Sequence, residues 1–155
     1  LWDNVKEAGA PYEIRPGSPN YIERLESGLL SYGADTDTES NPFELGLDRF
    51  IDLEQSVDFI GKQALSRIRD QGVSRLFKGV FLDGPKLSMI NEDRWRITHR
   101  GRDAGYVSAA AFSPRLESNI AVGMIATDVV QSGEPFEVKC EDCVRSGIAV
   151  DLPLI

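Results

Sequence analysis

The fold of this chain is decided from residue 75 onward, where RLFKGVFL (residues 75–82) opens a series of short runs with alternating apolar residues. Such alternation is typical of strands that bury one face. Further runs follow at residues 94–99, 104–111, 119–127, 134–140 and 144–151. Turn sequences such as Asp83-Gly84-Pro85, Arg100-Gly101-Arg102, Ser113-Pro114 and Ser132-Gly133 separate them. About six evenly spaced strands with no helix between them predict a small antiparallel barrel or sandwich.

The chain before residue 73 has a different, mostly helical pattern. We predict helices at residues 1–9, 19–30 and 61–71, short strands at 12–15 and 47–53, and a solvated polar loop at 34–42. Ser18-Pro19 is a typical helix start, and Gly72 is a typical residue after a helix end. We expect Ala64, Leu65 and Ile68 to face inward. The change of period near residues 71–74 predicts two parts, residues 1–72 and 73–155.

The charge balance and the first residues exclude several classes of protein. Lys and Arg number 17 against 25 Asp and Glu, a net charge of −8. Because such a chain repels phosphates, we expect no nucleic-acid partner. No apolar run approaches the roughly 20 residues that span a bilayer, and the N-terminus lacks a secretory pattern, so we expect a cytoplasmic protein without membrane contact. The chain starts at Leu1 rather than Met, which leads us to expect a fragment or processed product.

The two cysteines form a Cys-x-x-Cys pair, Cys140 and Cys143. A tetrahedral zinc site needs four ligands, and His99 is the single histidine of the chain. A thioredoxin-like motif would open a helix after a strand, whereas this pair lies between two strand-like runs. We therefore expect two reduced thiols in a hairpin turn, and no metal.

Five ordered blocks of the sequence resemble one family. RLESGLLSYG (residues 24–33) is similar to the Arg-Leu-Glu-x-Gly…Tyr-Gly signature of the glycine-cleavage T-protein (aminomethyltransferase) family. NPFELGL (41–47) and DFIGKQAL (58–65) follow at the spacing of that family. FSP (112–114) with NIAVGM (119–124), and then DLPL (151–154), resemble its C-terminal domain.

The resemblance implies a fold and a cofactor. The expected fold is α+β: residues 1–72 form the C-terminal part of a folate-binding body of helices and short strands. Residues 73–155 form a C-terminal antiparallel Greek-key β-barrel. The implied cofactor is tetrahydrofolate, and the implied partner is a small-molecule methyl or aminomethyl donor. The catalytic residues are unknown and expected in an N-terminal half that this chain lacks. We therefore expect no turnover and weak folate affinity from the 155 residues alone, and an apolar face that favours a homodimer.

Within the family, the sequence is more similar to one branch. Asn20 occupies the position of an arginine that contacts folate in glycine-cleavage aminomethyltransferases, and Val107-Ser108-Ala109 replaces their usual Thr-Ser-Gly. PNYIERLE (19–26), the Ser-Tyr-Gly ending at 31–33 and Asp151-Leu152-Pro153 resemble the dimethylsulfoniopropionate demethylases. The resemblance favours methyl transfer from a sulfonium donor to tetrahydrofolate. Aminomethyl transfer in glycine cleavage, and a non-catalytic folate-binding or interaction module, stay open as alternatives.

The resemblance gives four candidate folate-binding residues: Asn20, Arg24, Glu26 and Tyr32. Each also has a structural interpretation. Asn20 lies where a side chain bonds its own helix start, and Arg24 and Glu26 point in different directions because they are two residues apart on a helix. Tyr32 is suited either to stacking on a ligand or to packing between lobes.

Overall fold

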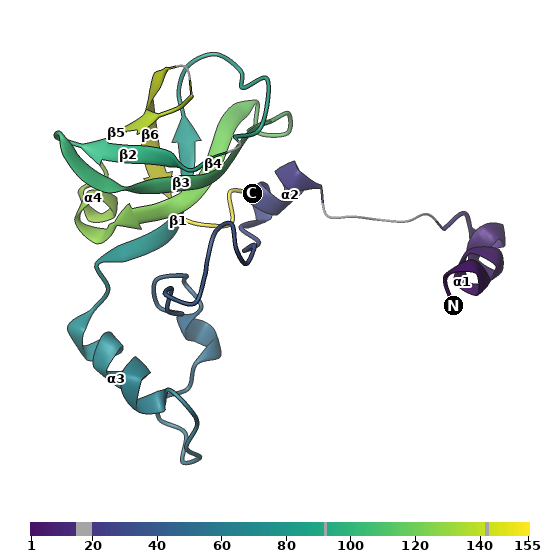
Figure 1. Ribbon diagram of the computed structural model, residues 1–155, viewed down its shortest axis with the longest axis horizontal. Coiled ribbons are helices and arrows are strands. Elements are labelled where there is room, and N and C mark those ends of the chain that lie inside the picture. The colour runs from purple at the N-terminus through teal and green to yellow at the C-terminus, as the bar shows by residue number, and fades with distance from the viewer. Residues whose placement is uncertain (15–19, 92, 142) are drawn as a thin grey trace.

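The computed structural model describes residues 1–14, 20–91, 93–141 and 143–155. From residue 75 the chain closes a six-stranded antiparallel barrel, seen at the upper left of Figure 1. Its strands are β1 (Arg75–Leu82), β2 (Trp95–His99), β3 (Arg102–Ser113), β4 (Ser118–Ala126), β5 (Phe136–Lys139) and β6 (Val144–Val150). Their order around the barrel is β1-β4-β3-β2-β5-β6. Because β1-β4-β3-β2 is a Greek-key order, the predicted α+β fold with a Greek-key barrel is confirmed.

Four helices accompany the barrel in the described residues. They are α1 (Trp2–Gly9), α2 (Tyr21–Ser27), α3 (Lys62–Gln71) and α4 (Thr127–Ser132), with two short 3₁₀ turns, η1 (Ala10–Tyr12) and η2 (Asp48–Phe50). In Figure 1, α2 lies beside the barrel next to the C-terminus, whereas α3 lies below and apart from the barrel. The helix that matters for the site is therefore α2.

Strand β4 shows why α2 packs where it does. Residues 119–125 of β4 are all buried, so this strand has no solvent-exposed face. Ala121 and Ile125 join the core inside the barrel. The alternate residues Ile120, Val122 and Met124 instead join a second core with Leu25 of α2. Successive side chains of a strand point to opposite faces, so β4 separates the two cores.

The C-terminal tail closes this second core. Leu152 and Leu154 pack against it, and both side chains approach Gly79 of β1, where a larger residue would displace them. The amide of Leu154 donates to the carbonyl of Glu26 in α2 (2.7 Å). The tail thus ties α2 to the barrel.

Several predicted elements differ from the structure. The helix expected at 19–30 ends at Ser27, because Gly28 adopts a left-handed conformation (φ 68°) that terminates it. The expected strands at 12–15 and 47–53 are replaced by η1 and η2 where the chain is described. The predicted start at Ser18-Pro19 lies outside the described residues. The barrel also contains α4, which the alternating pattern did not predict.

Helix α3 has the predicted extent but a weaker packing role. Gly72 follows its end with a positive φ of 78°, as expected. Leu65 and Ile68 are only half-buried, and Ala64 is exposed, so the expectation that Ala64 faces inward was wrong. Within the described ranges, no helix is both long and apolar enough to cross a membrane.

Candidate functional site

The site is built around the start and end of α2. The Asn20 side chain accepts a hydrogen bond from the amide of Ile22 (2.9 Å), the usual contact of an N-cap residue. At the other end, the amides of Gly28 and Leu29 return to carbonyls of α2. The chain then folds back through residues 28–36, which we call the α2 loop.

A buried carboxylate joins the α2 loop to both α2 and the barrel. Asp35 is 0% exposed. One carboxylate oxygen accepts from Arg24 Nη1 (2.5 Å) and from the Ser31 amide (2.8 Å). The other accepts from Ser108 Oγ (2.5 Å). Burying a charge is costly unless it is paired and hydrogen-bonded, and here the helix, the loop and the barrel each supply a donor.

Ser108 reaches Asp35 because of a bulge in β3. The pairing of β3 with β4 shifts between Val107 and Ala109, leaving Ser108 as the extra residue. A bulge of this kind re-aims a side chain and frees backbone groups. Asn91 satisfies part of that backbone, donating to the Ser108 carbonyl (3.2 Å) and accepting from the Ala110 amide (2.6 Å).

Arg94 provides a second connection from the barrel to the α2 loop. Its Nη2 donates to the Ala34 carbonyl (2.9 Å). Its guanidinium also lies 4.3 Å from the centroid of the Tyr106 ring, a cation–π distance. Two arginines, Arg24 and Arg94, therefore fix the same short loop from two sides.

The structure places the four predicted folate residues in two groups. Asn20 and Tyr32 are exposed, with Tyr32 at 74%. Arg24 is mostly buried and bonded to Asp35 and to the Leu29 carbonyl (3.0 Å). Glu26 is 3% exposed and accepts from Ser113 Oγ at the end of β3. As expected, Arg24 and Glu26 point in different directions. Arg24 bonds the α2 loop, and Glu26 bonds the end of β3. Any folate contact by the four residues stays a prediction.

Tyr21 completes the cluster beside Arg24. Burial raises the pKa of the Tyr21 phenol, against the lowering effect of Arg24, whose guanidinium lies 5.3 Å from the ring centroid. The phenol therefore stays protonated at neutral pH, next to an arginine that Asp35 already neutralises.

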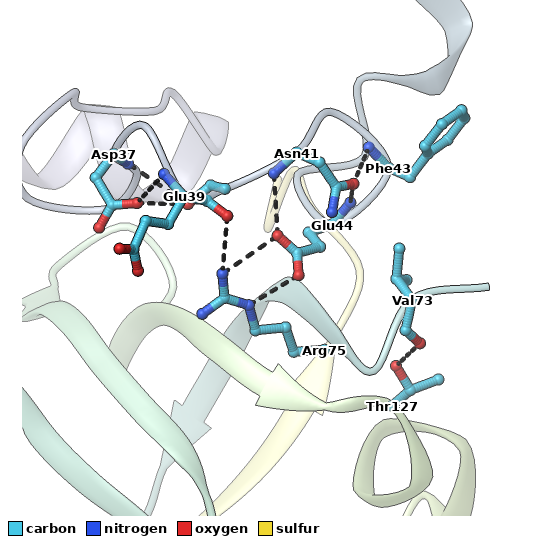
Figure 2. Close-up of polar contacts among 9 residues, drawn as sticks. Asp37, Glu39, Asn41, Phe43, Glu44, Val73, Arg75 and Thr127 are labelled. Atoms are coloured by element: carbon cyan, nitrogen blue, oxygen red, sulfur yellow. Dashed lines mark hydrogen bonds and ion pairs between the residues drawn. The ribbon is translucent and has the colours of Figure 1, made fainter. Parts of the chain in front are cut away.

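A second polar cluster joins the polar loop at 34–42 to β1 (Figure 2). Glu44 is buried; its carboxylate accepts from Arg75 Nε (2.8 Å) and from the Asn41 amide (3.0 Å). The carbonyl of Glu44 also accepts from the Phe77 amide (2.7 Å). The hydrogen bond that Arg75 donates to Glu44 raises the pKa of the Arg75 guanidinium. The prediction of a solvated polar loop at 34–42 was wrong at both ends, because Asp35 is buried and Asn41 donates to the buried Glu44.

His99 lies at the end of β2, beside the β2–β3 turn, where its side chain is buried and bonded. Its Nε2 lies 3.0 Å from Glu134 Oε2, and Arg100 Nη2 donates to both oxygens of Glu134 (2.7 Å each). The bond with His99 and the charge of Arg100 lower the pKa of Glu134. This cluster joins a hairpin to the segment before β5, and has the character of a structural ion pair.

Acid should weaken the fold through Glu134. The pKa of Glu134 is lower in the folded state than its ordinary value of 4.5. Its contribution to the free energy of unfolding is therefore fully present above pH 4.5 and is lost as the pH falls through the folded-state pKa. Urea unfolding at pH 7 and at pH 3 measures this loss. Glu134→Gln should reduce the difference between the free energies of unfolding at pH 7 and at pH 3. An unchanged difference would contradict the assignment.

Sequence reasoning missed the two residues that bring the site together, Asp35 and Ser108. In the sequence, Ser108 was noted only within Val107-Ser108-Ala109, and Asp35 only within the polar loop at 34–42. Across the described parts of the chain, no group of three or more His, Cys, Asp or Glu side chains is placed to hold a metal ion.

Comparison with known proteins assigns this arrangement, a Greek-key barrel with α2 packed on its outer face, to one class of protein domain. The family model described as the glycine cleavage T-protein C-terminal barrel domain matches residues 76–155. The model described as the GCVT N-terminal domain matches residues 1–55. The chain belongs to the glycine cleavage T-protein family, which confirms the resemblance seen in the sequence.

Individual relatives fall into two named activities. The chain is 37% identical over 145 residues to dimethylsulfoniopropionate demethylase DmdA of Ruegeria pomeroyi, covering 94% of this chain and 39% of that protein. It is 32% identical over 154 residues to an aminomethyltransferase of Synechococcus sp. (strain CC9902), covering 99% and 40%. The chain thus spans about 40% of the length of the curated relatives it matches.

A solved structure supports the fold. The aminomethyltransferase T of the glycine cleavage system from Bartonella henselae superposes with a TM-score of 0.76 at 19% identity. The match covers 87% of this chain and 37% of that one.

Proposed function

We propose that this chain is the C-terminal part of a tetrahydrofolate-dependent one-carbon transferase that moves a methyl group from a sulfonium donor such as dimethylsulfoniopropionate to tetrahydrofolate. The observation that carries this proposal is the 37% identity, across 94% of the chain, to a protein named for demethylating that donor. The sequence blocks at residues 19–26 and 151–153 point to the same branch.

The proposed chemistry makes modest demands on the protein. The methyl group is activated by the positive sulfur. The N5 lone pair of tetrahydrofolate forms a new bond to the methyl carbon as the bond from sulfur to carbon breaks. The electron pair of that bond stays on the sulfur, and the proton on N5 passes to water. The main requirement is alignment of N5 with the methyl carbon. A second is a pocket that accepts a cation, through aromatic faces or carboxylates. Neither requirement involves a metal.

The geometry favours two different roles for the four candidate residues, contact with the folate for two and positioning of α2 for the other two. Asn20 and Tyr32 are exposed and suited to touch the folate, Tyr32 by stacking its ring. Arg24 and Glu26 are engaged within the chain, so in this proposal they fix α2 and its loop at the edge of the folate site. Residues 1–72 then contribute to the folate-binding body, and residues 73–155 form the barrel that supports it.

A donor assay on the full-length protein tests the proposal. With tetrahydrofolate and dimethylsulfoniopropionate, we expect 5-methyltetrahydrofolate and the demethylated thioether in equal amounts, measured by liquid chromatography and mass spectrometry. We expect no turnover from the 155-residue chain alone. Product formed only with an aminomethyl group on a lipoyl protein would reject the sulfonium donor.

The second candidate function is aminomethyl transfer in glycine cleavage. It is favoured by the several relatives named aminomethyltransferase, at 30–32% identity. A third candidate, a non-catalytic folate-binding or interaction module, predicts folate binding without transfer from either donor. Homodimer formation stays a prediction, which the mass of the full-length protein in solution would test.

A further inference from the structure

The tip of the β5–β6 hairpin brings the two cysteines of the chain opposite each other. The last pair in the register of these strands is Lys139 with Val144. One step further, the amide of Cys140 donates to the carbonyl of Cys143 (2.9 Å). Cys140 and Cys143 are therefore the next opposed pair of the hairpin, as the hairpin interpretation of the sequence predicted.

Opposed positions of this kind suit a disulfide. Directly opposite residues of an antiparallel pair have Cα atoms about 4.5–5.5 Å apart, with both side chains on the same face. Disulfides span Cα separations of about 4.4–6.8 Å. Burial, and then the neighbouring Cys143, raise the pKa of the Cys140 thiol to about 11, so this thiol is protonated at neutral pH.

The two thiols differ in access. Cys140 is buried in the core of the barrel, whereas Cys143 is exposed. Cys143 also lines an open hollow of about 680 Å³ beside Trp95 and Arg145. A dissolved oxidant therefore meets Cys143 first, and Cys140 is placed to react only with its neighbour.

We propose that Cys140 and Cys143 are a reversible thiol-oxidation site that closes a disulfide across the tip of the β5–β6 hairpin when a small-molecule disulfide is present. The Cys143 thiolate attacks one sulfur of that disulfide, forms a mixed disulfide, and releases one small thiol. Cys140 then loses its proton and attacks Cys143 Sγ, which releases the second small thiol. Two protein thiols are oxidised, and one small disulfide is reduced to two thiols.

The closed form has a chemical consequence for the protein. It removes an exposed thiol that would otherwise be open to irreversible oxidation or to cross-linking with another chain. Because a main-chain hydrogen bond already joins the two residues, closure requires little rearrangement of the barrel. This proposal is independent of the donor and of the folate function.

Oxidised glutathione is a suitable probe, and the sequence provides a clean readout. Trypsin cuts after Lys139 and Arg145, so both cysteines leave in the single peptide Cys140–Arg145. The folded full-length protein is incubated with oxidised glutathione, free thiols are blocked by alkylation, and the denatured protein is digested. We expect the peptide to lose two hydrogen atoms and to take up no alkyl group, and dithiothreitol to reverse both changes.

Two matched variants test which of the two cysteines reacts first with oxidised glutathione. Cys140→Ser should hold glutathione on Cys143 as a stable adduct, because the resolving thiol is absent. Cys143→Ser should stay unmodified in the folded protein and become modified in urea, because only unfolding exposes Cys140. A stable glutathione adduct on the unsubstituted protein, or an unmodified peptide under conditions that modify Cys140→Ser, would overturn the proposal. Equally rapid modification of folded Cys143→Ser would overturn the assigned order.

Discussion

Replacing Asp35 with alanine should lower the free energy of unfolding by about 3–5 kcal/mol, the cost of breaking a buried charge pair by removing one partner. The substitution leaves Arg24 without its carboxylate, and the Ser31 amide and Ser108 hydroxyl without their acceptor. Urea denaturation followed by circular dichroism measures the change. The loss should appear as a lower midpoint of unfolding.

Asp37 offers a matched control two residues away. It is a carboxylate of the same polar segment, but it is exposed and bonds only to its neighbours Glu39 and Ser40 in the described contacts. Asp37→Ala should therefore change stability far less than Asp35→Ala. Equal effects of the two substitutions would show that Asp35 does not hold the α2 loop to the barrel.

Gly123→Ala should be the second large effect, at about 3 kcal/mol, the upper end of the usual overpacking range. Gly123 lies in β4 opposite Val107 of β3. An added Cβ would overlap the carbonyl oxygen of Tyr106 and approach the Cα of Val107 (2.8 Å). Since both are backbone atoms held in the barrel, β3 and β4 would have to separate. Urea denaturation measures the loss. The bulge at Ser108 lies directly beside the Val107–Gly123 pair that the added Cβ would push apart.

Gly79→Ala is the control for this substitution. Gly79 is also a strand glycine, so the effect on the unfolded chain is the same. Its added Cβ would meet side-chain atoms of Leu154, Leu152 and Val150 rather than backbone. Those side chains can move, so we expect a cost of about 1 kcal/mol. A larger loss from Gly79→Ala than from Gly123→Ala would contradict the account of the barrel.

The barrel was predictable from the sequence because its strands alternate and its turns contain glycine or proline. The first strand, residues 75–82, was predicted with its observed bounds. Helix α4 was missed because its six residues are too few to show a helical period. The end of α2 was predicted at residue 30, because the apolar spacing continues past Gly28, the residue that ends the helix.

The candidate site was less predictable for a physical reason. A polar residue in a short loop has the same sequence appearance whether it is solvated or buried. The burial of Asp35 depends on Ser108, 73 positions away along the chain, and on a bulge that no local pattern indicates. The resemblance directed attention to residues 24–33, because Arg24, Glu26 and Tyr32 are part of a contiguous motif, and their contact with folate stays a prediction.

Binding of tetrahydrofolate to the full-length protein, measured by isothermal titration calorimetry, tests the central claim most directly. We predict saturable binding, unchanged in Tyr32→Phe and weakened roughly fivefold in Tyr32→Ala, since a stacked ring contributes on the order of 1 kcal/mol. A full-length protein that shows no saturable binding of tetrahydrofolate would contradict the proposed function.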